Sequence, residues 1–334
     1  MFEEFYHFKT HPFRLSPDPN FICMTEQHRE ALSGLIYSVC TRPGLSVLIG
    51  EAGTGKTTIL YTLLSLLERR RYFTAMCTIP TLTREEFYEF LLLKLGVNCA
   101  SASKTKQLFA LEEALKQYRA EGRPAVLIVD EAQRLPAELL EEIRLLLNLE
   151  TPQEKLLEIV LAGQPELAVT LRREELRQLK QRVGCICHLK PLNAEEAGEY
   201  MLHRLAQAGH SEPGLFTAAA IQSLYEFAGG LPRLINTLAD TALRIGFAVQ
   251  SPNITPFIVN EAARELELVR AVPDAVSAEP QNDVVARLDA KLRESLAEIP
   301  AAETPAARAS MPLESYASRQ KSLGFFSQWM GFLK

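Results

Sequence analysis

The stretch LIGEAGTGKTTIL, at residues 48–60, constrains the fold of this chain more than any other segment. Residues 50–57 match the pattern GxxxxGK[ST], in which glycines, a lysine and a hydroxyl side chain stand at fixed spacing. The apolar run Leu45–Ile49 before the loop predicts a buried strand, and the residues after it predict a helix. A strand, a glycine-rich loop and a helix in this order form a phosphate-binding unit of α/β proteins, so a parallel sheet is expected.

The glycines of this loop allow backbone N–H groups to turn toward phosphate oxygens, and the following helix adds the positive end of its dipole. Lys56 is expected to reach the terminal phosphates of a nucleotide, and the Thr57 hydroxyl to ligate Mg²⁺. We therefore predict ATP and Mg²⁺ as the cofactors. The predicted nucleotide-binding residues of the loop are Gly50, Glu51, Ala52, Gly53, Thr54, Gly55, Lys56, Thr57 and Thr58.

A second element, VLIVDEAQ, ends a hydrophobic run with two carboxylates. Asp130 is expected at the end of a strand buried on both faces, where its carboxylate can hold Mg²⁺ directly or through water. Glu131, the next residue, can polarise the water that attacks the terminal phosphate. The alternative is that Glu131 is a surface acid that opens a loop. Because a kinase must keep water away from the terminal phosphate, this pair of carboxylates favours hydrolysis.

Four further polar side chains are weaker candidates for catalysis. Gln164 follows a strand expected beside the Asp130 strand, where its amide can bond the attacking water; a plain strand-end turn is the alternative. Arg233 is expected in the first turn of the helix that follows GLPR and can reach across to the nucleotide. Arg182, and less favourably Arg177, lie in LRQLKQRVG and can reach a neighbouring subunit's phosphate as an arginine finger. Most arginines on such a helix are simply solvated.

Short β-rich runs alternate with helical segments over the first 190 residues, which predicts an α/β sandwich. The expected strands are Leu45–Ile49, Tyr72–Ile79, Ala125–Val129, Leu157–Leu161 and Cys185–Leu189. One helix is expected before the first strand, with Thr25 as its N-cap and Cys40 near its end. After Pro191 the pattern is helical only, with helices expected at Ala194–Gln207, Thr217–Ala228, Leu231–Val249 and Pro256–Leu268.

The predicted organisation therefore has five parts. Residues 1–24 form an arm rich in aromatic side chains and proline that is expected to be extended, 25–191 an α/β nucleotide-binding domain, and 192–269 an α-helical lid domain. Residues 270–320 are rich in Ala, Pro, Glu and Ser and are predicted to be a largely disordered linker with one helix at Val284–Ile299. Residues 321–334 place aromatic side chains on one helical face, which can dock on a membrane surface, a partner or the ATPase body.

Composition disfavours several classes of protein. The chain has 36 Lys and Arg against 41 Asp and Glu, a formal net charge of −5, which disfavours indiscriminate binding of nucleic acid. The N-terminus is not a secretory signal and no run approaches 18 apolar residues, so a cytoplasmic location is expected. The six cysteines are expected to be reduced. Cys185 and Cys187 are expected on one face of a strand, where packing is favoured over a metal half-site.

With these residues considered, the chain resembles AAA+ ATPases, and more closely the ExeA/GspA-type ATPases of general secretion. The resemblance covers about residues 1–268 and rests on the order of HPFRLSPDPNF, GEAGTGKTT, VLIVDEAQRL, LAGQPEL, LKQRV and GLPRLIN. It implies a AAA+ P-loop fold, with a parallel five-stranded sheet between helices followed by a small all-α lid. It also implies roles for four residues: Glu131 is catalytic, Gln164 is the first sensor, Arg182 is the finger and Arg233 is the second sensor.

The resemblance implies an oligomeric ATPase that drives assembly or remodelling of a cell-envelope machine for secretion or exopolysaccharide export. ExeA-type proteins continue into a membrane segment and a peptidoglycan-binding domain, so the expected role here comes from the ATPase domain alone. The alternatives are a DNA-associated ATPase that helps transposition target choice, and a weakly hydrolysing, nucleotide-switched scaffold. Further copies of the chain and an envelope protein are the expected partners, with peripheral membrane contact through the tail; nucleic acid is less favoured.

Overall fold

The computed structural model describes residues 2–15, 21, 23–78, 81–99, 103–210 and 214–271. The predicted linker helix at 284–299 and the aromatic tail at 321–334 lie outside the described residues. Those described belong to one compact unit that spans residues 1–289. Within these ranges, no helix combines the length and the apolar character that crossing a bilayer requires.

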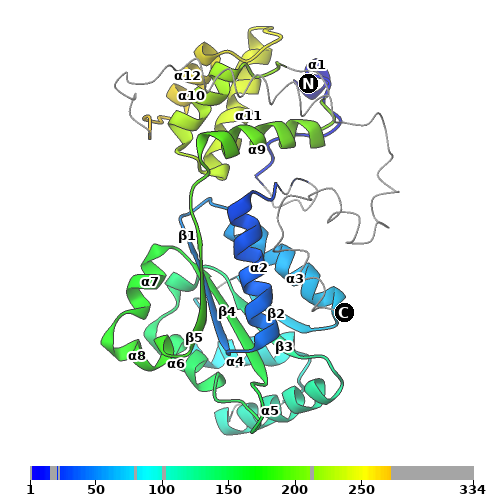
Figure 1. Ribbon diagram of the computed structural model, residues 1–334, viewed down its shortest axis with the longest axis vertical. Helices are drawn as coiled ribbons and strands as arrows, with labels where there is room; N and C mark the ends of the chain where they lie inside the picture. The colour runs from blue at the N-terminus through cyan, green and yellow to red at the C-terminus, as the bar shows by residue number, and fades with distance from the viewer. Residues whose placement is uncertain are drawn as a thin grey trace. The chain divides into compact units, whose positions relative to one another are not determined.

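Five parallel strands form a single sheet with the order β2-β3-β4-β1-β5 (Figure 1). Every residue of the strands β1, β3 and β4 is buried, as expected for the central strands of a sheet covered on both faces. The bounds of the strands are β1 Leu45–Gly50, β2 Phe73–Cys77, β3 Ala125–Val129, β4 Leu157–Gly163 and β5 Val183–Leu189.

Helices cover both faces of the sheet and enclose two hydrophobic cores. Alternate residues of β1 enter opposite cores: Val47 and Ile49 pack in one, and Leu48 in the other. The Leu48 core is completed by α2 (Glu26–Thr41) and α3 (Lys56–Arg69). The other core is completed by α4 Arg84–Lys94, α5 Lys104–Ala120, α6 Ala137–Leu146, α7 Pro165–Leu171, the 3₁₀ turn η3 Glu174–Leu176 and α8 Arg177–Lys180.

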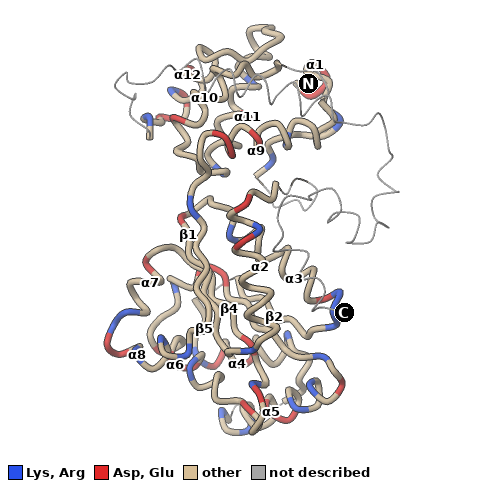
Figure 2. The backbone as a smooth tube through the Cα atoms, viewed as in Figure 1, with Lys and Arg blue, Asp and Glu red and all other residues tan. Residues whose placement is uncertain are grey.

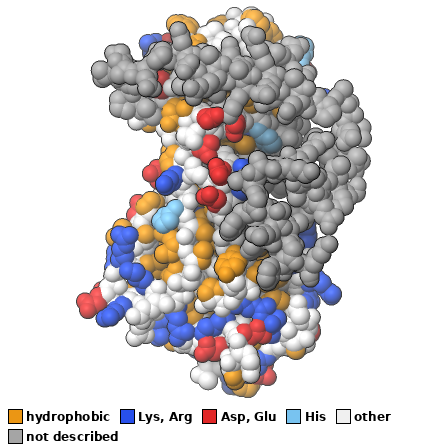
Figure 3. All heavy atoms as spheres, in the orientation of Figure 1, with side chains coloured by type: hydrophobic (Ala, Val, Ile, Leu, Met, Phe, Trp, Pro, Cys, Tyr) orange, Lys and Arg blue, Asp and Glu red, His pale blue; other side chains and the backbone are white. Residues whose placement is uncertain are grey.

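Strand β5 lies at an edge of the sheet and begins two residues before the predicted start at Cys185. The Sγ atoms of Cys185 and Cys187 lie 3.6 Å apart, so the prediction that both thiols share one face is confirmed. They face α2, where a Cβ atom added to Gly34 would lie 2.9 Å from the Cys187 sulfur. Ile186 points to the other face and is 54% exposed. Figure 3 shows hydrophobic side chains at the surface in the region of the sheet. Packing against α2 accounts for the two cysteines, and the described residues contain no cluster of three metal-ligating side chains.

The region after the sheet is helical, as predicted. Its helices are α9 Ala194–Gln207, α10 Ala218–Ala228, α11 Pro232–Ala248 and α12 Pro256–Glu265. The helix α9 begins with a capping box, in which the Asn193 side chain accepts the Glu196 N–H and the Glu196 side chain accepts the Asn193 N–H. Proline is the first residue of α11 and of α12, where the backbone N–H group that proline lacks would have no acceptor within the helix.

The N-terminal arm packs against this helical region. Residues Phe2–Phe5 form one helical turn, α1, so the prediction of an extended arm is wrong at its start. The Tyr6 hydroxyl donates to the carbonyl oxygen of Ser251 at 3.0 Å. Further along, Arg204 donates from Nε to the carbonyl oxygen of Pro12 at 2.6 Å, and the Phe13 ring meets a buried phenylalanine of the helical region edge-on. Aromatic rings therefore anchor the arm, as predicted.

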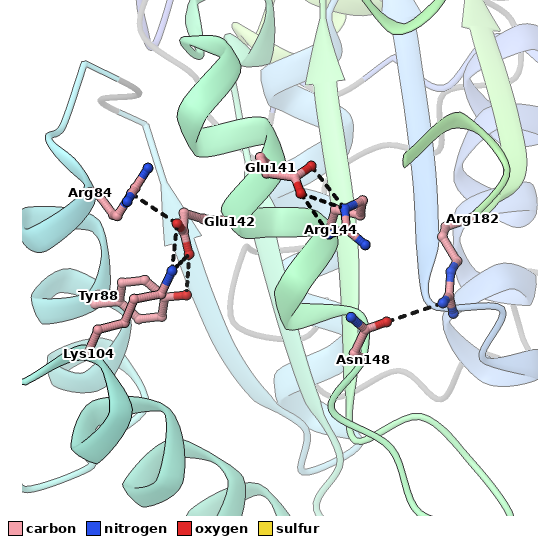
Figure 4. A network of polar contacts seen from close by, with 8 residues as sticks. All are labelled: Arg84, Tyr88, Lys104, Glu141, Glu142, Arg144, Asn148 and Arg182. Atoms are coloured by element: carbon pink, nitrogen blue, oxygen red, sulfur yellow. Dashed lines mark hydrogen bonds and ion pairs between the residues drawn. The ribbon is translucent and has the colours of Figure 1, made fainter. Parts of the chain in front are cut away.

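A buried carboxylate joins three helices on one side of the sheet (Figure 4). Glu142, on α6, is 2% exposed. It accepts the Tyr88 hydroxyl at 2.6 Å and lies 2.9 Å from the Arg84 Nε atom, both carried by α4. Lys104, at the start of α5, contributes a second cation at 2.7 Å. Each oxygen of the buried acid is therefore compensated, as burial of a charge requires.

Glu158, on β4, is the one Asp, Glu, Lys or Arg on the five described strands. The strands are accordingly almost entirely tan in Figure 2. Glu158 is 3% exposed, its Oε2 accepts the Gly44 N–H at 3.0 Å, and its Oε1 has no hydrogen-bond partner. Burial raises the pKa of the Glu158 carboxyl to about 7, against the Gly44 hydrogen bond and the nearby cations Arg42 and Lys155, which lower it.

We expect the free energy of unfolding of the variant Glu158→Gln to increase relative to that of the wild type as pH rises. Between about pH 5 and pH 8 the folded wild type must lose a proton that the unfolded chain has already lost, so its free energy of unfolding falls as pH rises. The glutamine keeps the oxygen that accepts the Gly44 N–H and has no proton to lose. The difference between the two proteins should grow by at most about 3 kcal/mol across this window. Urea unfolding at pH 5 and pH 8 measures it, and a constant difference would contradict the prediction.

Candidate nucleotide-binding site

The predicted phosphate loop connects the end of β1 to the start of α3. Gly53 and Gly55 have φ angles of 85° and 97°, a left-handed conformation that side chains with a Cβ atom rarely adopt. The Thr54 hydroxyl donates to the carbonyl oxygen of Glu51 at 2.8 Å, which closes the loop on itself. The two glycines are therefore required by the backbone path that turns the chain from the strand into the helix.

Lys56 places its ammonium group over this loop. The side chain is 5% exposed, and Nζ donates to the carbonyl oxygens of Gly50 at 2.7 Å and Glu51 at 2.8 Å. Burial lowers the pKa of Lys56, while the nearby carboxylates of Glu131 and Asp130 raise it. A buried cation held only by carbonyl oxygens and neighbouring acids is suited to bind the terminal phosphates of a nucleotide.

Thr57 and Asp130 meet at the same place, although 73 positions separate them in the sequence. The Thr57 hydroxyl donates to Asp130 Oδ2 at 2.7 Å, and Asp130 is 4% exposed at the end of β3. A hydroxyl oxygen beside a carboxylate oxygen is a donor set that Mg²⁺ accepts. The two residues therefore fit the predicted metal site.

Glu131 has an unusual backbone conformation. Its φ and ψ angles are 52° and 34°, in the left-handed region that residues other than glycine rarely adopt. Its N–H donates to Asp130 Oδ1 at 2.9 Å, and its carboxylate accepts the Nε2 group of Gln133 at 2.7 Å. A strained residue held by such contacts is typical of functional sites.

Gln164 follows β4, which pairs with β3 through Leu161 and Val129, so the predicted neighbouring strands are confirmed. The Gln164 N–H donates to Gln133 Oε1 at 3.1 Å. Gln133 therefore connects Gln164 to Glu131, a role that was not predicted from the sequence. Its place in VLIVDEAQ was visible, but its contacts depend on the 3₁₀ turn Ala132–Arg134, which brings its side chain back toward the strand ends.

His28 supports the loop from the start of α2. Its Nε2 lies 3.2 Å from the Thr54 carbonyl oxygen, and its Nδ1 lies 2.7 Å from the Thr25 hydroxyl. Burial lowers the pKa of His28, which favours the neutral ring. Thr25 has the backbone conformation of the predicted N-cap, but its hydroxyl contacts His28 and makes no capping hydrogen bond. A Cβ atom added to Gly55 would lie 3.0 Å from His28 Nε2, so the ring lies directly beneath the loop.

Arg233 lies in the first turn of α11, as predicted. Its N–H donates to the carbonyl oxygen of Gly53 at 3.3 Å, and a Cβ atom added to Gly53 would lie 2.9 Å from Arg233 Cβ. The side chain of Arg233 is exposed. The backbone of Arg233 therefore contacts the phosphate loop, and the action of its side chain at the nucleotide stays a prediction.

Arg182 and Arg177 are both exposed near α8. Figure 4 shows that Arg182 reaches Asn148, whose Oδ1 accepts the Arg182 Nη2 group at 3.2 Å. The structure thus brings Lys56, Thr57, Asp130, Glu131 and Gln164 into one site and gives Arg182 a different partner. An arginine finger acts on the nucleotide of a neighbouring subunit, so its role stays a prediction.

Comparison with known proteins agrees with this geometry. A family model described as an AAA domain matches residues 40–171. General secretion pathway protein A of Aeromonas hydrophila is 39% identical over 271 residues, which are 81% of this chain and 49% of that protein. The chain therefore spans about half the length of the curated relative that it matches.

Solved structures with the same fold include two archaeal proteins. Cdc6p from Pyrobaculum aerophilum has a TM-score of 0.57 at 14% identity, over 90% of this chain and 86% of that chain. The Aeropyrum pernix ORC2 protein, solved as ADPNP-ADP complexes, has a TM-score of 0.56 at 14% identity, over 77% and 72% of the two chains. Identities this low show the fold alone. The chain therefore has the fold of the AAA+ P-loop nucleoside triphosphatases and, over four-fifths of its length, resembles the general secretion pathway protein A family.

Proposed function

We propose that this chain hydrolyses ATP to ADP and phosphate, and that an oligomer of it uses this reaction to assemble or remodel a cell-envelope machine. The observation that carries the hydrolysis is the meeting of Thr57, Asp130 and Glu131 beside the buried ammonium of Lys56. A carboxylate adjacent to the metal-binding pair is placed to accept a proton from an attacking water.

Each residue of the site has a distinct task in this proposal. The loop N–H groups and Lys56 bind the phosphates and orient the terminal one. Thr57 and Asp130 hold Mg²⁺, which neutralises charge that develops on the phosphate oxygens. Glu131 takes the proton of the attacking water, and Gln164 and Arg233 contact the terminal phosphate from the β4 end and from α11. Arg182 supplies a cation to the site of a neighbouring copy.

The machine on which this ATPase would act is proposed from the curated relative. The likeness to general secretion pathway protein A supports a machine for secretion. Exopolysaccharide export and a place at the inner face of the cell membrane are further parts of the proposal. The likeness to archaeal Cdc6p and ORC2 proteins supports only the fold, and a net charge of −5 gives no support to the DNA-associated alternative. An envelope protein is therefore the proposed partner, and the tail at 321–334 the proposed point of membrane contact.

Phosphate release from ATP by the purified full-length chain tests the proposal. We expect steady release with Mg²⁺ and none when EDTA removes the metal. A second assay without the chain controls for spontaneous hydrolysis. If the chain binds ATP with Mg²⁺ and still releases no phosphate at any protein concentration, the chain is a nucleotide-switched scaffold and the proposed activity is wrong.

The variant Arg182→Ala should bind ATP as the wild type does and lose most of its hydrolysis, because its guanidinium acts on a neighbouring copy. An arginine finger contributes roughly 10³-fold or more to hydrolysis. Since Arg182 is exposed and its guanidinium donates to the side chain of Asn148, its removal should leave the free energy of unfolding nearly unchanged.

Specific activity as a function of protein concentration, measured for Arg182→Ala, Arg177→Ala and the wild type, checks this prediction. Arg177→Ala is the matched control on the same surface and should be less affected. Wild-type activity per chain that does not depend on concentration across the assembly range would contradict a shared site.

A further inference from the structure

Gln133 uses both ends of its amide within the candidate site. Its Nε2 group donates to Glu131 Oε2 at 2.7 Å, and its Oε1 accepts the Gln164 N–H at 3.1 Å. The first bond joins it to the carboxylate next to the metal-binding aspartate, and the second to the residue that follows β4. One half-buried side chain thus links the ends of two neighbouring strands.

The chemistry of the partners fixes the orientation of this amide. An ionised carboxylate can only accept hydrogen bonds, and a backbone N–H can only donate one. A flipped amide would place its oxygen against the carboxylate and its NH₂ group against the N–H, so both contacts would be repulsive. Gln133 therefore has one favourable orientation, and in it the Glu131 carboxylate is held from one side.

A neighbouring glycine supports the same arrangement independently. Gly163 is the last residue of β4 and its φ angle lies outside the left-handed range, so its backbone does not require glycine. A Cβ atom at this position would lie 2.8 Å from Gln133 Oε1 and 2.9 Å from the Leu167 side chain. The absence of a side chain at Gly163 leaves the space that the Gln133 amide occupies.

We propose that Gln133 is a positioning residue, which holds the Glu131 carboxylate at a fixed place relative to the end of β4. This inference rests on the proposed ATP hydrolysis. Glu131 has three rotatable side-chain bonds, and a carboxylate that must meet one water molecule loses efficiency when it is displaced by about 1 Å. Gln133 acts through Glu131, and it is not itself required to touch the nucleotide.

The test compares Gln133→Met with the wild type. Methionine has similar length and cannot form either hydrogen bond of the amide. We expect kcat for ATP hydrolysis to fall by about 10- to 100-fold, while KM and the dissociation constant of ATP change by less than about threefold. Gln117→Met is the matched control, because the Gln117 amide also donates to a glutamate carboxylate, that of Glu121 at 3.0 Å, on the surface of α5. It should leave kcat unchanged.

A double variant separates positioning from a general structural effect. In the background of Glu131→Gln, the further change Gln133→Met should lower kcat only slightly, because the carboxylate that Gln133 holds is already absent. A structural defect would instead lower kcat by the same factor in both backgrounds. Gly163→Ala should resemble Gln133→Met, since its methyl group displaces the Gln133 amide.

A Gln133→Met variant with wild-type kcat, or an equal loss of activity in both backgrounds, would overturn the inference. Loss of ATP binding in Gln133→Met would also overturn it, because the residue would then act on the nucleotide itself. A wild-type chain that releases no phosphate overturns the proposed function and this inference together. An active wild type with an equally active Gln133→Met variant overturns the inference alone.

Discussion

Replacing Lys56 with alanine should reduce the affinity for ATP by about 100-fold or more. Lys56 is 5% exposed and its ammonium group is held above the loop by two carbonyl oxygens, so it is oriented before a nucleotide arrives. A hydrogen bond to a charged group contributes about 1.5–3 kcal/mol, and a loss near 3 kcal/mol corresponds to roughly two orders of magnitude in affinity. Equilibrium titration with a fluorescent ATP analogue measures the effect.

The control for this variant is Lys155→Ala. Lys155 also donates to a backbone carbonyl oxygen, that of Leu147 at 2.8 Å, but it precedes β4, whereas Lys56 follows β1. It should keep wild-type affinity. If Lys56→Ala unfolds at the same temperature as the wild type and still binds ATP with similar affinity, the residue does not contact the phosphates.

The variant Glu131→Gln should bind ATP and hydrolyse it about 10²- to 10⁴-fold more slowly, the range that general base catalysis contributes. Glutamine has the same shape, so the contacts around the left-handed backbone of residue 131 can persist. Its amide cannot accept the proton of water. The bound nucleotide should therefore remain as ATP.

Single-turnover hydrolysis and the identity of the nucleotide that co-purifies with the protein measure this effect. The exposed Glu138, on α6, offers a matched control, because Glu138→Gln removes the same charge away from the site. A Glu131→Gln variant with the parental rate would show that another group accepts the proton.

The sheet was largely predictable from sequence, and β3 has the predicted bounds, Ala125–Val129. Its residues are buried on both faces, so an unbroken apolar run identifies them. The edge strand β5 was harder to delimit, because one of its faces is exposed and the alternation of Gly184, Ile186 and His188 with buried or half-buried residues weakens the apolar signal.

The site residues that occupy fixed positions in a known motif were predictable from the sequence. Lys56, Thr57, Asp130 and Glu131 meet as expected because a strand, a loop and a helix bring them together. Gln133 was not predictable, since its contacts depend on the turn after Glu131 and on the space beside Gly163. Such contacts between the ends of two strands leave no periodic pattern in the sequence.

The arm also has a consequence for the order in which this protein can be completed during synthesis. Its residues contact positions 192 and 245 places later in the chain, at Arg204 and Ser251. At about 5–20 residues per second, roughly 12–50 s pass between the emergence of the arm and that of its last contacts. Throughout that interval the phenylalanine and tyrosine rings of the arm are exposed on the nascent chain. The arm is made well before the helices that it contacts, so it is among the last segments to find its place, and it is where a chaperone would protect the growing chain.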